Sequence, residues 1–216
     1  MAPTTRPGDL QGYPVELLFE RADSGGMSVM SWPDHLLTLA EFDELPEDNS
    51  RRYELQEGVL QVSPKAAAVH QRVIKRLTAI LDAQLPVKWE VLPDVEVVIG
   101  GGFPATVRIP DVIMASTQAF DANPNRLIAA DVVLAVEVVS PGSGRIDRLV
   151  KVQEYAQAGI PHYWIIEIDD SVTLTALRLC DGGYEPQFEG GGMFKTVEPF
   201  EIGIDLASLV VRAPGR

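Results

Sequence analysis

Hydrophobic and polar residues alternate in some segments of the chain and recur with the period of a helix in others. The segment RRYELQEGVLQVSP, residues 51–64, alternates on both sides of Glu57-Gly58, which predicts a β-hairpin that turns at the glycine. Between residues 65 and 85, apolar side chains recur along one side, which predicts a helix. The residues on this side are Val69, Val73, Leu77, Ile80 and Leu81.

The second half of the chain combines strand patterns with one further helix. The segment AADVVLAVEVVS, residues 129–140, is almost continuously apolar, as expected of a central strand covered on both faces. A helix is predicted from about Gly144 to Ala158. Gly159 and Pro161 are expected to end it. These elements indicate an α/β or α+β fold with a mixed central sheet flanked by helices. Further strands are predicted at residues 88–100, 105–116, 162–169 and 171–180, with short strands after Cys180.

The beginning of the chain has a different character. Residues 1–30 are rich in Pro, Gly, Ser and charged residues, so we expect a flexible arm. The segment WPDHLLTLAEFDELPED predicts a short helix that begins at Pro33-Asp34 and stops at Pro46. We expect a single domain over residues 31–210, followed by a tail at 211–216, since this length supports one hydrophobic core.

Charge and composition restrict the class of protein further. The formal net charge is −13, and an acidic surface repels phosphate backbones, although it leaves room for a local basic cleft. A single cysteine, Cys180, excludes an internal disulfide and a metal site made of cysteines. We find neither a signal-peptide pattern nor an apolar stretch of membrane-spanning length. These features predict a soluble cytoplasmic protein without a membrane partner.

Three acidic residues occupy positions in apolar strands, where a carboxylate is costly. They are Glu54, Asp111 and Glu137. A buried carboxylate must be paired, hydrogen-bonded or bound to a metal, so three of them suggest a site for Mg²⁺ or Mn²⁺. Each acid also has a structural interpretation. Asp111 could cap a turn or accept backbone N–H bonds, Glu137 could be an incidental charge on an edge strand, and Glu54 could pair with Arg51, Arg52 or a neighbouring lysine.

The helix after the Glu137 strand carries a candidate catalytic lysine. Asp147, Lys151 and Tyr155 recur at intervals of four residues, so they share one face of the helix. If this face turns toward Glu137, Lys151 could orient an attacking water molecule or stabilise a transition state. If it turns to solvent, Asp147 and Lys151 form a surface pair that contributes little to stability.

Several of these segments together resemble the Uma-two family of prokaryotic candidate endonucleases. This family belongs to the restriction-endonuclease-like, PD-(D/E)XK superfamily. The resemblance covers roughly residues 31–205, and it implies a restriction-endonuclease-like core and DNA as the substrate. The matching segments are LTLAEFDELPED, RRYELQEGVLQVSP, His70, RIPDVIMAS and AVEVVSPGSGRIDRLVKVQEYAQAGIPHYWIIE.

The resemblance implies a role for each acid. Asp111 matches the acid of the PD motif and Glu137 matches the acid of the (D/E)XK motif, so both are expected to bind the metal. Glu54 matches an acid that is often supplied from the N-terminal helix or hairpin region, so it is expected to assist catalysis as a metal ligand or base. The lysine of the motif is absent, because Val139 stands two residues after Glu137 on the same side of the strand. Lys151 is the nearest candidate for a relocated catalytic lysine.

Basic residues near these motifs are expected to bind the substrate. They are Lys65, His70, Arg108, Arg145 and Arg148, and Lys65 is also a second candidate for the relocated lysine. His70 has an alternative interpretation as a buried histidine that bonds to the backbone.

Two functions are therefore open. The first is a Mg²⁺- or Mn²⁺-dependent endonuclease that cleaves DNA phosphodiester bonds. The second is a weak or inactive nuclease-fold protein that acts through protein contacts. A homodimer is expected in both cases, because cleavage of both strands usually needs two sites and cyclic dimers are the commonest assembly.

Overall fold

A computed structural model describes residues 19–21, 27–29, 33–46, 51–139 and 145–210, with the backbone alone for 19–21, 27–29 and 145–148. The chain divides into two units, Met1–His35 and Leu36–Arg216. In the first unit, β1 (Phe19–Arg21) pairs antiparallel with β2 (Met27–Val29). Most of the predicted flexible arm and the predicted tail lie outside the described residues, so both stay predictions.

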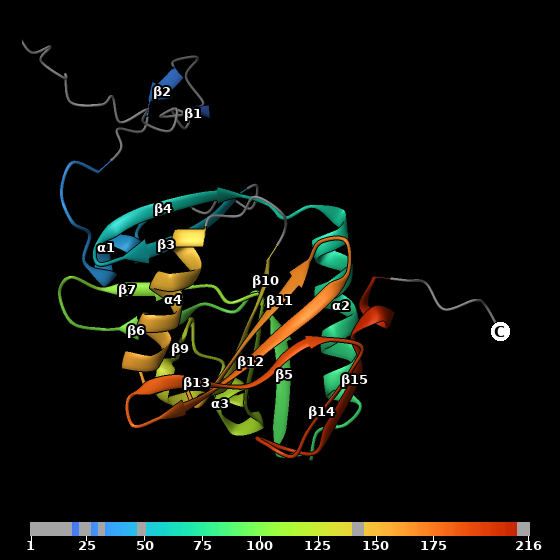
Figure 1. Ribbon diagram of the computed structural model, residues 1–216. Coiled ribbons are helices and arrows are strands. Elements are labelled where there is room, and N and C mark those ends of the chain that lie inside the picture. The colour runs from blue at the N-terminus through green and yellow to red at the C-terminus, as the bar shows by residue number, and fades with distance from the viewer. Residues whose placement is uncertain (1–18, 22–26, 30–32, 47–50, 140–144, 211–216) are drawn as a thin grey trace, which may run out of the picture. The chain divides into compact units, whose positions relative to one another are not determined.

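The second unit is built on a mixed six-stranded sheet with the order β13-β12-β11-β10-β8-β5 (Figure 1). Its central strand β10 (Val132–Val139) pairs parallel with β11 (His162–Ile168) and antiparallel with β8 (Val112–Ser116). The other pairings are antiparallel. The outer strands are β5 (Trp89–Pro93), β12 (Val172–Cys180) and β13 (Gly183–Gly191).

Helices α2 (Ala68–Asp82) and α4 (Arg145–Gln157) lie on opposite sides of this sheet (Figure 1). Side chains of β10 alternate between the two sides. Val136 and Val138 belong to the hydrophobic core that contains α2, whereas Ala135 packs in the core that contains Tyr155 of α4. Since residues two apart on a strand share a face, Glu137 points to the side of α4.

The pattern on α2 follows the sequence prediction with one exception. Val73, Leu77 and Leu81 are fully buried against the sheet, and Ile80 packs against the same core. Val69, in the first turn of the helix, is 46% exposed and is not part of this core.

A second sheet has the order β4-β3-β7-β6-β9 and covers a smaller core. Strands β3 (Arg51–Gln56) and β4 (Val59–Pro64) form the predicted hairpin. Glu57 and Gly58 both have positive φ, 46° and 78°, as in the two-residue turn that suits the twist of a hairpin. A Cβ atom on Gly58 would lie 2.8 Å from the Cβ of Leu36, so the turn also needs a glycine for space.

The strands predicted at 88–100 and 105–116 are each broken at a Pro-Asp dipeptide. The first divides into β5 and β6 (Val97–Gly100), and the second into β7 (Thr106–Arg108) and β8. In each case one part joins the five-stranded sheet and the other the six-stranded sheet. Proline cannot donate to a strand ladder, and Asp94 after Pro93 has a φ of 55°, so the chain turns there from one sheet to the other.

The remaining elements are short. Helix α1 (Leu39–Asp43) begins at Thr38, whose capping box with Glu41 replaces the predicted start at Pro33-Asp34. Within the described chain, no helix combines the length and the apolar character that crossing a membrane requires. The other elements are α3 (Thr117–Asp121), β9 (Leu127–Ile128), β14 (Met193–Thr196), β15 (Ile202–Asp205) and the 3₁₀ turns Ala129–Asp131 and Leu206–Leu209.

A core substitution on α2 tests this packing. Leu77→Ala leaves a cavity at a side chain with no exposed surface, so we expect the free energy of unfolding to fall by about 2–5 kcal/mol. Val69→Ala on the same helix removes an exposed side chain and is expected to change it by less than about 0.5 kcal/mol. Chemical denaturation of both variants measures the difference, and equal losses would contradict the assigned faces of α2.

Candidate functional site where the chain crosses between the sheets

Asp111 lies where the chain passes from β7 of the smaller sheet into β8 of the larger one. The ladder between β8 and β10 ends at the pair Val112–Val136, so Val138 has no backbone partner on that side. The carboxylate of Asp111 takes the partner's place: the Val138 N–H donates to its Oδ2 at 2.7 Å. Asp111 is 2% exposed, and this bond holds it beside the strand that carries Glu137.

The carbonyl of Val138 is satisfied by His70, in the first turn of α2. The His70 Nε2 lies 2.7 Å from this oxygen and 3.1 Å from Oδ2 of Asp111. Both neighbours accept hydrogen bonds, so Nε2 carries the proton. The His70 Nδ1 is buried and has no hydrogen-bond partner among the residues that the structure describes. These contacts make His70 a residue that positions Asp111, and they do not support its predicted direct contact with the substrate.

Arg52 of β3 supplies the positive charge next to Asp111. Its Nη1 donates to Oδ1 of Asp111 at 2.8 Å. Burial opposes ionisation of Asp111, but the hydrogen bonds and charges of His70 and Arg52 outweigh burial and lower the pKa of this carboxyl. Burial likewise opposes the charged form of His70, and Asp111 outweighs it and raises the pKa of the imidazole.

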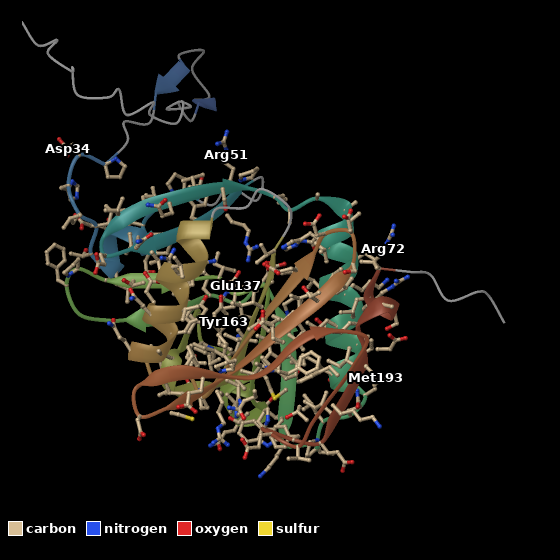
Figure 2. The ribbon with its side chains drawn as sticks, viewed as in Figure 1. Asp34, Arg51, Arg72, Glu137, Tyr163 and Met193 are labelled. Atoms are coloured by element: carbon tan, nitrogen blue, oxygen red, sulfur yellow. The ribbon has the colours of Figure 1, made fainter. Side chains whose placement is uncertain are left out.

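Glu137 lies inside the second unit, at the end of the sheet nearest β3 and β4 (Figure 2). Its Oε1 accepts hydrogen bonds from Nζ of Lys151 at 3.1 Å and from the hydroxyl of Tyr155 at 2.9 Å. Burial raises the pKa of Glu137 to about 7. Lys151 opposes this shift, whereas the nearby charges of Asp111 and Glu54 add to it. The three predicted acids are thus close enough to influence one another.

Lys151 and Tyr155 of α4 do share a helix face, and this face is turned toward Glu137. The Nζ of Lys151 also lies 3.8 Å from Oε1 of Glu54 on β3, so the ammonium group bridges acids from the two sheets. On β10, Val139 stands where the resemblance to the (D/E)XK motif leads one to expect a lysine. The ammonium group of Lys151 reaches Glu137 from helix α4 instead. Its catalytic role stays a prediction, as do the roles of the three acids.

Arg108 of β7 is enclosed by acids and is 1% exposed. Its Nε and Nη2 donate to both oxygens of Glu154 on α4, at 2.7 and 2.8 Å, and its Nη1 donates to Glu54 at 3.3 Å. The predicted contact of Arg108 with phosphates does not fit this burial. The arginine instead joins α4 to the smaller sheet, and it thereby sets the face that α4 turns toward Glu137.

Glu54 is shared between the backbone and two cations. Its Oε1 accepts the N–H of Ile109 at 2.8 Å, directly before the Pro-Asp break, and Arg108 and Lys151 are its charged neighbours. Arg52, one of the partners that the sequence suggested for Glu54, pairs with Asp111 instead. Four residues of this network were not predicted as part of the site: Arg52, Asp94, Glu154 and Tyr155.

The other predicted substrate contacts are Lys65, Arg145 and Arg148. Lys65 is exposed in the segment between β4 and α2. Arg145 and Arg148 belong to the first turn of α4, and their side chains lie outside the described part of the chain, as does that of Asp147.

The chemistry of the site suits a hard divalent cation. In the described parts of the chain, no group of three or more His, Cys, Asp or Glu side chains is arranged to hold a metal ion. Mg²⁺, however, usually takes one or two carboxylates and completes its shell with water. Asp111 and Glu137 provide two such carboxylates. Burial raises the pKa of Glu137, and the charges of Asp111 and Glu54 add to this shift, so a cation placed between these carboxylates would favour their ionised forms.

The Arg108 network can be tested by its effect on stability. Arg108→Met leaves Glu54 and Glu154 without their shared cation, so we expect the free energy of unfolding to fall by about 3–5 kcal/mol. Arg178→Met breaks the ion pair with Glu198, in which the side chains of Arg178 and Glu198 are 41% and 53% exposed. Because solvent screens these two charges, the substitution should change stability far less than Arg108→Met does. Chemical denaturation distinguishes the two variants, and similar small losses would contradict the role of Arg108 as a buried link.

The pKa of Glu137 predicts a pH dependence of stability. The native state holds this proton up to about pH 7, whereas an unperturbed glutamate releases it near 4.5. The native state therefore binds more protons between these values, so stability falls as the pH rises through this window. We expect Glu137→Gln, which stays neutral, to reduce the loss between about pH 5 and about pH 8 by roughly 1–3 kcal/mol.

The measurement is chemical denaturation of both proteins across this pH range in a buffer with a metal chelator. His70, whose raised pKa acts in the same direction, is present in both proteins, so the difference isolates Glu137. Glu201→Gln changes an exposed acid and serves as the control. Parallel pH curves for wild type and Glu137→Gln would refute the raised pKa.

Comparisons with known proteins agree with this architecture. A solved structure described as a putative nuclease belonging to DUF820, from Anabaena variabilis ATCC 29413, superposes with a TM-score of 0.66 and 18% sequence identity. The match covers 81% of this chain and 97% of that chain, and it shows a shared mixed α+β fold. No curated protein matches the chain. Residues 39–208 match the sequence pattern of Uma2, described as "Putative restriction endonuclease", and the chain therefore belongs to the Uma2 family.

Proposed function

We propose that the protein is a divalent-cation-dependent endonuclease that hydrolyses DNA phosphodiester bonds. The observation that carries this proposal is the convergence of Asp111, Glu137 and Lys151 at the crossing between the sheets. Two acids and an amine in one buried cluster are the groups that metal-assisted phosphodiester hydrolysis needs. The family of the chain is described as "Putative restriction endonuclease", and the similar solved structure as "a putative nuclease", which supports the same reaction class.

In this proposal, Asp111 and Glu137 hold Mg²⁺ or Mn²⁺. When bound, the cation would lower the pKa of a coordinated water molecule and offset negative charge on the phosphate. The chain prepares Asp111 for this role, because His70 and the Val138 N–H fix its orientation and keep it ionised. The hydroxyl of Tyr155 fixes the orientation of Glu137.

Lys151 is proposed to act on the reacting groups. In hydrolysis, the water oxygen bonds to phosphorus, the bond to the leaving oxygen breaks, and that oxygen receives a proton. The ammonium group of Lys151 lies between Glu137 and Glu54, where it can hold the attacking water or donate to a phosphate oxygen. Glu54 is proposed to position Lys151, since the backbone of Ile109 and Arg108 already fix both of its oxygens.

Local charge balance reconciles the site with the acidity of the whole chain. The cluster holds five carboxylates, counting that of Asp94, and three permanent cations, with His70 as a fourth cation when it is protonated. A bound divalent cation would offset the excess of negative charge, so phosphate could approach this cluster although the chain carries a net charge of −13. The proposed substrate contacts outside the cluster are Lys65, Arg145 and Arg148.

A second candidate function is a nuclease fold that acts through protein contacts without cleavage. The observation that favours it is the pairing of every acid in the cluster with a cation of the chain itself, which lets the site persist without a metal. A homodimer and a cytoplasmic location stay predictions under both functions. Ultracentrifugation would test the homodimer.

Cation binding and cleavage separate the two functions. We expect wild type to bind Mg²⁺ or Mn²⁺ in calorimetry and to cut plasmid DNA, and Glu137→Ala to lose roughly 10- to 100-fold in cation affinity. Cleavage by Glu137→Ala should fall by about 100-fold or more, since the site then lacks a ligand.

Glu201→Ala removes an exposed acid and should behave as wild type in both assays. Equal cation binding by wild type and Glu137→Ala would sink the proposed site. Cation binding without cleavage of plasmid, linear or single-stranded DNA would favour the second candidate.

A further inference from the structure

The permanent cations of the cluster differ in their access to solvent. The side chain of Arg108 is 1% exposed and that of Lys151 is 9% exposed, and carboxylates from both sheets or from α4 enclose each of them. The side chain of Arg52 is 22% exposed. Among the cluster cations that the structure describes, Arg52 is therefore the one with an open side.

The guanidinium of Arg52 lies between a buried acid and an exposed acid. Its Nη1 donates to Oδ1 of Asp111 at 2.8 Å, and its Nη2 lies 2.7 Å from the Ile109 carbonyl and 3.2 Å from Oδ1 of Asp94. The side chain of Asp94 is 45% exposed, against 3% for Asp111. In the described chain these contacts use three of the five N–H donors of an arginine, so donors remain for a ligand.

The backbone explains why Arg52 occupies this position. Arg52 and Glu54 are two residues apart on β3, so both side chains point to the crossing between the sheets. Asp94 lies at the other strand break, and its N–H contacts the carbonyl of Asp111 at 3.4 Å. The two Pro-Asp breaks thus lie together, and they give the guanidinium one anchor inside the site and a second anchor at its edge.

We propose that Arg52 contacts the non-bridging oxygens of the scissile phosphate, and that it competes with the divalent cation for Oδ1 of Asp111 before substrate binds. This inference rests on the proposed nuclease function. A guanidinium offers a planar fork of donors that matches two phosphate oxygens, whereas one donor contacts Asp111 here. Asp94 can hold the side chain at the edge of the site while its bond to Asp111 is exchanged for one to phosphate.

The competition for Asp111 is tested by cation affinity, which does not depend on activity. Arg52→Gln removes a positive charge next to Oδ1, so we expect Mg²⁺ to bind roughly 5- to 10-fold more tightly in calorimetry. Arg52→Lys keeps the charge and should bind Mg²⁺ as wild type does. Arg72→Gln, an exposed arginine on α2 with the same loss of charge, is the matched control and should leave the affinity unchanged (Figure 2).

The phosphate contact is tested by the affinity for a fluorescently labelled DNA duplex. Ca²⁺ replaces Mg²⁺ in this assay, because it takes oxygen ligands of the same kind. We expect Arg52→Gln to bind the duplex about 10-fold more weakly, the loss typical of a charge-assisted hydrogen bond. Arg52→Lys should bind more weakly than wild type, because a lysine lacks the fork, and Arg72→Gln should stay within about 2-fold of wild type.

The outcomes separate this inference from the function on which it rests. If wild type binds neither Mg²⁺ nor the duplex, the proposed function fails and the role of Arg52 fails with it. If wild type binds both and the Arg52 variants match Arg72→Gln, only the role of Arg52 is overturned. Circular dichroism checks that Arg52→Gln folds. If it does not fold, Arg52→Lys decides, because wild-type affinity for the duplex in that variant would overturn the proposal.

Discussion

The site depends on how Val138 completes its hydrogen bonds where β8 ends. The N–H and carbonyl of one strand residue point to the same side, and on this side β10 has lost its neighbour. Asp111 accepts from the N–H and His70 contacts the carbonyl, so two side chains replace the missing strand. Because unpaired backbone groups are costly when buried, this requirement fixes a carboxylate beside Glu137 whether or not a ligand is present.

The second constraint is the ion pair that orients α4. Arg108 donates two hydrogen bonds to Glu154. On α4, Glu154 lies about one turn after Lys151 and directly before Tyr155. Fixing Glu154 on the smaller sheet therefore fixes the direction in which Lys151 and Tyr155 point, toward Glu137 on the larger sheet. Helix α4 joins the two sheets. The arrangement of Lys151 relative to the carboxylates of Asp111 and Glu137 depends on this junction.

The elements with a strong hydrophobic periodicity were predictable from the sequence. The acidic residues that interrupt an apolar strand pattern were predictable as well. The hairpin at Glu57-Gly58, the helix over α2 and the central strand β10 follow from local patterns alone. The breaks at Pro93-Asp94 and Pro110-Asp111 were missed, because the apolar pattern continues across them while the chain changes sheets. Pro-Asp was the local signal, since proline interrupts a ladder and aspartate accepts the hydrogen bonds that the break exposes.

Partners in the network were harder to predict than its acids. A carboxylate in an apolar strand is conspicuous by itself, whereas Arg52 and Glu154 look like ordinary surface residues until their distant partners are known. Arg52 is 59 residues from Asp111 in sequence, and Arg108 is 46 from Glu154. Alternation along β3 could have placed Arg52 on the same face as Glu54. Only the fold shows that Arg52 pairs with Asp111 and that Glu154 pairs with Arg108.

The balance of charge in the cluster explains how such a site can exist in a folded protein. Burying Asp111, Glu54 and Glu154 without partners would cost several kcal/mol each, and the paired arginines offset most of this cost. Glu137 is the exception: although Lys151 and Tyr155 contact it, its pKa remains raised to about 7. Burial is the main cause of this shift, and the charges of Asp111 and Glu54 add to it. The surrounding residues therefore stabilise the ionised form of Glu137 less than that of Asp111, whose pKa is lowered by His70 and Arg52.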